Sequence, residues 1–306
     1  MNVAQPAAPL AVLGVSVAIV STAAIMIRFA QQEGVPSLAI AFWRLAIAAG
    51  VLAIFVGAQT ERRFEARSLP KQVWLLVIAA GFFLALHFAS WISSLAYTSV
   101  ASSAALVTTN PIWIAVISWL LFRERIGGWL AVGIATAMLG SLCIFLSDTM
   151  LATPTINQAT AHPNPALGNS LALVGSLTVC GYLLIGRRLA GVVSIWLYVT
   201  LVFSAATGFL LLFAWLANTN LTHFSQLGWL CLIGLALGPQ LLGHTGINWS
   251  LKHLTPALVA IAILAEPVGS AWLAWWMFDE RFELLQLSGF TLLLTGIFLA
   301  LRSPRS

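Results

Sequence analysis

Ionisable side chains within long apolar stretches are the groups of this chain that could do chemistry. Of the nine acidic residues, only Glu266 lies deep in such a stretch, and Arg44 is the matching cation. A charge in lipid is costly and usually faces a cavity or a partner. Two interpretations of Glu266 stay open. It makes a structural contact, with Arg44 or with backbone freed by Pro267, or it binds a ligand amine or a proton.

Two histidines, His87 and His244, also lie in apolar stretches, 157 residues apart. Each is followed four residues later by a polar or aromatic residue, Trp91 or Asn248, and such a pair shares one face of a helix. Because a polar stripe facing lipid would be penalised, we expect that face to point into a cavity; the alternative is a pair of packing histidines. No cluster has metal-ligand spacing, so no metal site is predicted.

Prolines interrupt three of the apolar stretches, at Pro111, Pro239 and Pro267. A proline inside a helix frees a carbonyl group and permits a kink. Broken helices in membrane proteins often line a ligand path, and a static packing kink is the alternative. The neighbouring Asn110 and Gln240 are expected either to satisfy freed backbone groups or to touch a ligand.

The elements that must position these residues are long apolar helices. The chain has 306 residues, of which 60% are hydrophobic and 8% are charged, whereas a soluble domain carries about 25% charged residues. Each spanning helix needs about 20 apolar residues, and helices satisfy every backbone group within lipid. We predict an all-α integral membrane protein with ten transmembrane helices, over residues 10–30, 36–57, 72–95, 100–122, 127–147, 167–186, 194–217, 227–250, 256–278 and 284–301.

The basic residues predict the orientation of these helices. Most of the 14 Lys and Arg residues fall in loops on one side of a ten-span chain or in its C-terminal tail. The positive-inside rule then places both termini in the cytoplasm, and we expect the inner membrane of a bacterium. The net charge of +5 thus reflects topology and does not predict binding to nucleic acid.

The chain contains an internal repeat. Residues 94–140 match residues 250–296 at 12 of 47 positions without a gap, and the matches include rare residue types. Among the matching pairs are Pro111 and Pro267, Trp119 and Trp275, Glu124 and Glu280, Gly133 and Gly289, and Gly140 and Gly296.

Five spans per copy force the second copy to enter the membrane inverted. We therefore predict a first repeat over 1–147, a periplasmic linker over 148–166 and a second repeat over 167–306. Inverted repeats are typical of secondary transporters, whose halves rock about a site near the midplane. The paired glycines are expected to allow close helix packing, against either the other half or a second copy of the chain in a homodimer.

Three sets of residues also carry a family resemblance. They are the turns Phe122-Arg123-Glu124-Arg125 and Phe278-Asp279-Glu280-Arg281, the pairs Asn110-Pro111 and Glu266-Pro267, and Phe42-Trp43-Arg44. By these residues the chain resembles proteins with two EamA repeats in the drug/metabolite transporter (DMT) superfamily. The resemblance implies a central cavity lined mainly by spans 1–4 and 6–9, with spans 5 and 10 as outer supports. Aromatic amino-acid exporters of the YddG type look most similar.

The predicted function is that of a secondary transporter. It would export amino acids, aromatic ones included, and related small metabolites by alternating access. A multidrug or nucleotide-sugar-like carrier of the same fold is one alternative, and an intramembrane enzyme or sensor is another. The sequence has no ATP-binding loop and no catalytic signature, so neither an enzyme nor a cofactor is predicted.

The predicted site residues fall into two groups. The substrate-binding residues are His87, Trp91, Asn110, Trp113, Tyr182, Gln240, His244, Asn248 and Glu266. The structural or gating residues are Arg44, Pro111, Pro239 and Pro267.

Overall fold

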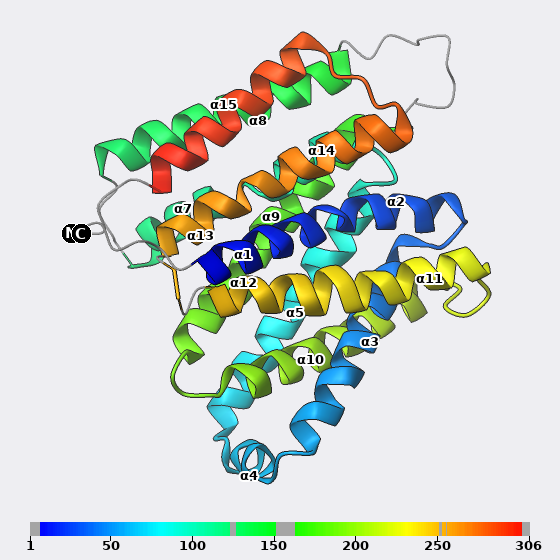
Figure 1. Cartoon of the computed structure of the whole chain (residues 1–306), viewed down its shortest axis with the longest axis vertical. Helices are drawn as coiled ribbons and strands as arrows, with labels where there is room; N and C mark the ends of the chain where they lie inside the picture. The colour runs from blue at the N-terminus through cyan, green and yellow to red at the C-terminus, as the bar shows by residue number, and fades with distance from the viewer. Residues whose placement is uncertain (1–6, 123–126, 151–162, 251–252, 255, 302–306) are drawn as a thin grey trace.

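The computed structural model describes residues 7–122, 127–150, 163–250, 253–254 and 256–301 (Figure 1). Within these ranges the chain is helical apart from short turns and one isolated bridge between Ala190 and Val193. The predicted all-α class is therefore confirmed. The turn at 123–125, which the sequence comparison pairs with 279–281, lies outside the described residues.

The helix ends agree with the predicted spans to within three residues. The elements are α1 (Ala7–Ser21), α2 (Ala23–Gln32), α3 (Ser37–Gly57), α4 (Thr60–Ser68), α5 (Lys71–Ser94), α6 (Val100–Val107), α7 (Asn110–Phe122), α8 (Gly128–Met150), α9 (Pro165–Leu189), α10 (Ile195–Leu216), α11 (Gln226–Leu235), η2 (Ala236–Gly243), α12 (His244–Ser250), α13 (Pro256–Ile263), α14 (Ala265–Phe278) and α15 (Leu284–Leu301).

Taken singly or joined across their breaks, these helices form stretches that are long and apolar enough to cross a membrane. Among the described residues eight stretches meet both conditions, and Leu284–Ala300 is a shorter apolar helix. The remaining predicted span corresponds to α13 and α14, which are separated at Leu264. Large apolar side chains such as Ile54, Trp276 and Leu284 point outward, as suits a multi-pass integral membrane protein whose surface meets lipid.

One helix was not predicted. The polar segment after α3, expected to be a loop, forms α4. Glu61 in its first turn and Arg67 in its last turn oppose the helix dipole favourably. Glu65 then accepts hydrogen bonds from the backbone N–H and the hydroxyl of Ser194, at 2.6 and 2.7 Å. α4 is thereby tied to the start of α10, and this end of the bundle is called the α4 end below.

Four of the spans are interrupted near their middle. The breaks lie at Thr22, at Thr108 and Thr109, across the π-helical η2, and at Leu264. The hydroxyls of Thr22, Thr108 and Thr109 donate to the carbonyls of Ile19, Ala105 and Leu106, at 2.7 to 2.8 Å. Such side chains satisfy backbone groups that a break leaves without a helical partner, which is what makes it tolerable inside a membrane.

The prolines lie at these breaks, as predicted. Pro111 and Pro267 fall in the first turns of α7 and α14, directly after the interruption, and Pro239 lies inside η2. The first two are equivalent in the repeat, so the two copies are broken at the same depth.

The two copies lie head to foot. α8 and α15 are equivalent helices, yet Gly133 of α8 packs against Gly296 while Gly140 packs against Gly289. This order means that the two helices run antiparallel, side by side at one edge of the bundle (Figure 1). The equivalent pair α3 and α10 is antiparallel too, because Phe55 contacts Trp196 near one end and Trp43 bonds to Leu221 near the other.

The glycines on α8 and α15 therefore pack the two halves of one chain together. A Cβ atom at Gly133 would lie 2.7 Å from the carbonyl oxygen of Gly296, and one at Gly140 would lie 2.6 Å from that of Gly289. Only glycine allows the backbones to approach this closely. Of the two predicted partners for this glycine face, the structure supports the other half.

Replacing Gly140 with leucine should separate α8 from α15. Overpacking of this kind costs roughly 1–3 kcal/mol, so we expect a lower melting temperature of the detergent-purified protein. Gly50→Leu is the matched control, since nothing lies within 4 Å of a Cβ at that mid-helix position. Equal melting temperatures for the two variants would contradict the packing described here.

Candidate functional site

Arg44 of α3 is the most deeply buried charged side chain in the described structure, with 1% of its surface exposed. Its Nε donates a 2.7 Å hydrogen bond to Oε1 of Gln240. Gln240 follows Pro239 inside η2 and is itself buried. A π-helical turn shifts the side chains that follow it around the helix axis, and such turns are frequent at functional sites. The bond joins the two halves of the chain across 196 residues.

The Arg44 guanidinium lies over two aromatic rings of α5. Its Cζ is 4.6 Å from the ring centroid of Phe88 and 5.7 Å from that of Trp91. A desolvated cation over an aromatic face gains about 2 kcal/mol. The two rings thus offset part of the cost of holding this charge away from water.

His87 extends the same cluster. Its Nδ1 lies 2.9 Å from the carbonyl oxygen of Gly175 on α9. A carbonyl can only accept, so Nδ1 carries the proton and, in the neutral ring, Nε2 is the acceptor. The imidazole stacks on Trp91 with a centroid separation of 5.9 Å. Trp91 and His87 therefore share one face of α5, as their spacing predicts.

His244 and Glu266 face the same cluster from the second half. His244 begins α12 and is exposed, and Glu266 lies in the first turn of α14 and is half-buried. Both interact electrostatically with Arg44, and His244 also with His87. His244 and Glu266 are therefore close enough to Arg44 to share its electrostatic environment.

The predicted structural contacts of Glu266 do not form. Its carboxylate and Arg44 interact electrostatically but are not within the 4.0 Å of an ion pair. Within the described residues, no backbone group donates a hydrogen bond to this carboxylate. Its position in the first turn of α14 stabilises a negative charge through the helix dipole. The carboxylate remains available to a ligand.

Three other predicted site residues lie outside this cluster. Asn110 accepts a bond from Cys180 through its backbone carbonyl, and the indole of Trp113 donates to Thr109 at 3.2 Å. Tyr182 stacks on Tyr198 of α10. These contacts connect α7, α9 and α10 and do not extend to Arg44. The side chain of Asn248 lies outside the described part of the structure.

A second polar cluster closes the end of the bundle opposite α4, called the Glu280 end below. The carboxylate of Glu280 accepts the backbone N–H of Val100 at 3.0 and 3.1 Å, which caps the start of α6. Arg28 of α2 lies 3.8 Å from the same carboxylate and donates to the carbonyl of Thr98 at 2.6 Å. A residue of the second half thus fastens two helices of the first.

The side chain of Asp148 organises the rest of this end. Its Oδ2 accepts a 2.7 Å bond from Asn169, and its Oδ1 accepts a 2.9 Å bond from Gln286. Gln286 also donates to Ser102 at 2.8 Å. Together these bonds link α6, α8, α9 and α15. Polar contacts between the two halves thus hold these helices together at the Glu280 end.

This second cluster was not predicted. From the sequence alone Arg28 has no evident role, Glu280 lies in a turn and Asp148 begins the predicted linker. The signal that could have found it is the match of Glu280 to Glu124 in the repeat, because an acid kept at both turns suggests a shared role.

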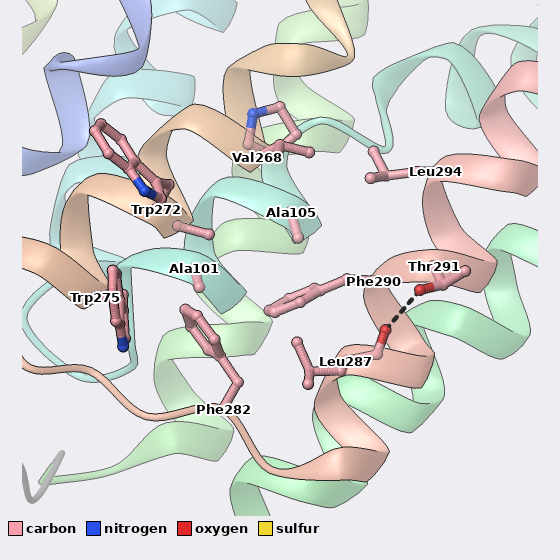
Figure 2. Close-up of a pocket in the computed structure, with 12 residues that line it drawn as sticks. Ala101, Ala105, Val268, Trp272, Trp275, Phe282, Leu287, Phe290, Thr291 and Leu294 are labelled. Carbon is pink, nitrogen blue, oxygen red and sulfur yellow. Dashed lines mark hydrogen bonds between the residues drawn. The ribbon is translucent and has the colours of Figure 1, made fainter.

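An apolar groove lies between α6, α14 and α15 (Figure 2). It has a volume of about 350 Å³ and is lined by Trp272, Trp275, Phe282 and Phe290 among others. Its one hydroxyl, that of Thr291, already donates to Leu287 at 2.9 Å. Apart from this hydroxyl and the indole N–H groups of Trp272 and Trp275, the side chains that line the groove are apolar, and Arg44 is not among them.

The comparisons with known proteins agree with this architecture. The EamA-like transporter family matches over residues 8–146 and again over residues 166–302. A solved structure described only as a crystal structure of a protein is similar over 97% of both chains, with a TM-score of 0.61 and 17% identity, which supports the fold alone. No curated protein matches the sequence. Since the family match covers most of the chain in two copies, the protein belongs to the EamA-like transporter family.

Proposed function

We propose that this transporter exports amino acids, aromatic ones included, and related small metabolites across the bacterial inner membrane. It would act as a secondary transporter by alternating access. The observation that carries the proposal is the polar cluster at Arg44, to which both inverted halves contribute. A relative rotation of the halves changes which side of the membrane reaches a site at their interface.

The orientation follows from the positive-inside rule. The α4 end carries Arg62, Arg63 and Arg67 as well as Arg187 and Arg188, so we assign it, and both termini, to the cytoplasm. The Glu280 end then faces the periplasm. In the described structure that end is fastened by Glu280 and Asp148, while His244 stays exposed at the central cluster. We propose that these contacts close the part of the periplasmic end formed by α6, α8, α9 and α15; a hollow of about 400 Å³, lined by Pro36, Tyr97 and Thr219 among others, lies at the same end.

The roles of the site residues follow from their positions. Glu266, His87 and His244 provide polar contacts to the substrate, and Trp91 provides an apolar wall. Asn110, Trp113, Tyr182 and Asn248 lie outside the central cluster or outside its described part, and we propose them as contacts made in other states of the cycle. The breaks at Pro111, Pro239 and Pro267 give the helices their points of bending. The moving units are residues 1–147 and 167–306, joined by the linker 148–166.

Removing the charge of Glu266 should impair transport more than folding. We expect Glu266→Gln to reach the membrane in nearly normal amounts and to lower the uptake of labelled phenylalanine into reconstituted vesicles at least 10-fold. The neighbouring Val268→Ala, an exposed position on the same helix, is the matched control. Unchanged flux in Glu266→Gln would exclude a role in substrate binding.

Removing the cap on α6 should loosen the Glu280 end. With the three native cysteines replaced by alanine, we introduce Ala101→Cys, a position that is 1% exposed next to Val100. An impermeant thiol reagent added from the periplasmic side should label this cysteine slowly, and several-fold faster when Glu280→Ala is also present. Equal rates in both backgrounds would show that Glu280 does not hold this end shut.

The same contact should respond to pH. Burial raises the pKa of the Glu280 carboxyl above its ordinary value; the Val100 N–H and Arg28 oppose the shift, and Asp148 adds to it. Glu280 therefore takes up a proton at a higher pH than an exposed glutamate does, and the neutral carboxyl loses its ion pair with Arg28. Labelling at position 101, measured relative to Thr222→Cys in an exposed loop, should accelerate as the pH falls through that pKa. Glu280→Gln should abolish this dependence, and its persistence would contradict the assignment.

A further inference from the structure

Two buried donors in the central cluster have no acceptor. They are Nη1 of Arg44 and Nε1 of Trp91, whose side chains are 1% and 6% exposed. A buried donor without a partner costs about 1–3 kcal/mol, and more when it is charged. The guanidinium carbon lies 5.7 Å from the Trp91 ring centroid, so both donors belong to one small region.

The acceptors nearby are already engaged or do not reach these donors. Oε1 of Gln240 is occupied by Nε of Arg44, and the carbonyl oxygen of Gly175 is occupied by His87. Glu266 interacts with Arg44 but lies beyond ion-pair distance. No acceptor among the described residues bonds to either donor. Because both atoms are buried in this state, an acceptor on a ligand would reach them when the two halves move apart.

A carboxylate is the group that suits these two donors. It has two oxygens, and it forms strong charge-assisted hydrogen bonds with a guanidinium. The Glu266 carboxylate also interacts electrostatically with Arg44 and forms no ion pair within the described residues, so it could bind an ammonium group. A molecule that carries both groups has no net charge, so its entry adds no uncompensated charge to a low-dielectric interior. A simple anion would face repulsion from Glu266, and a simple cation would face repulsion from Arg44.

The other buried atoms without a hydrogen-bond partner differ from those at Arg44, because the charge near them is compensated within the chain. Nε of Arg28 and Oε1 of Gln31 also lack partners, but Arg28 already has Glu280 and the carbonyl of Thr98. At Arg28 the charge is therefore compensated within the chain. At Arg44 the bonded partner is the neutral amide of Gln240.

We infer that Arg44 and Trp91 bind the carboxylate of a zwitterionic α-amino acid through Nη1 and Nε1, while Glu266 binds its ammonium group. The inference rests on the proposed function and names the substrate class of that site. It assigns a binding role to Arg44, which the sequence suggested only as a structural or gating residue.

The test compares phenylalanine with phenylalaninamide, which lacks the carboxylate, in vesicles containing the full chain. The wild type should transport phenylalanine about 10- to 100-fold faster than the amide, since a hydrogen bond to a charged group contributes about 1.5–3 kcal/mol. Arg44→Gln should lose most of this preference by slowing phenylalanine only. Arg44→Lys keeps the positive charge but lacks the planar guanidinium, which can donate two parallel hydrogen bonds. This variant should retain part of the preference for phenylalanine over the amide.

A milder variant guards against misfolding. Trp91→Phe keeps a ring against His87 and Arg44 but removes the indole N–H, and it should lower the preference about 10-fold, as expected for one hydrogen bond to a charged acceptor. Binding is measured separately by the melting temperature of the purified protein. Phenylalanine should stabilise the wild type more than it stabilises either Arg44→Gln or Glu266→Gln. 3-Phenylpropionate should stabilise Glu266→Gln, in which the repelling carboxylate is gone, but not Arg44→Gln. Phenethylamine should stabilise Arg44→Gln but not Glu266→Gln.

The outcomes separate the two proposals. If the wild type neither transports phenylalanine nor is stabilised by it, the proposed function is overturned, and the inference with it. If the wild type transports phenylalanine while folded Arg44→Gln keeps the full preference over the amide, only the inference is overturned.

Discussion

A guanidinium buried in the middle of a membrane protein is the constraint on which the rest of this structure depends. Arg44 cannot be left without partners in a low-dielectric interior. Its neighbours come from both halves: Phe88 and Trp91 from α5, and Gln240 from η2. Any movement of one half against the other must therefore rearrange the contacts of this charge. That coupling between a central charge and the interface is what an alternating-access carrier needs.

The broken helices bring polar groups to the cluster around Arg44. An uninterrupted helix presents only side chains to a cavity, whereas a break can turn a helix end toward it. At the break before α14 the positive end of the helix dipole lies at Glu266, and the π-helical turn of η2 carries Gln240 to Arg44. Threonine hydroxyls satisfy the backbone at the breaks in α1–α2 and α6–α7. The inverted packing of α8 against α15 then holds this interface from the outside.

The fold could be predicted from the sequence because span length and hydropathy leave few choices in lipid. Contacts between residues that are distant in the chain could not be predicted in this way. The bond between Arg44 and Gln240 depends on a π-helical turn that no local pattern reveals, and α4 has the composition of a loop. The pairing of His87 with Trp91 was predictable because both share one helix face. The full network at Glu280 could not be predicted, because its members lie far apart in the chain and meet only in the folded bundle.

The central claim is that the polar cluster borders an aqueous chamber between the halves. A cysteine introduced as His244→Cys, in a chain without its native cysteines, tests this most directly. An impermeant reagent applied from the α4 end should label it, and bound phenylalanine should slow that labelling. If only a lipid-soluble reagent reaches position 244, its side chain faces the bilayer and the account of a shared central site is wrong.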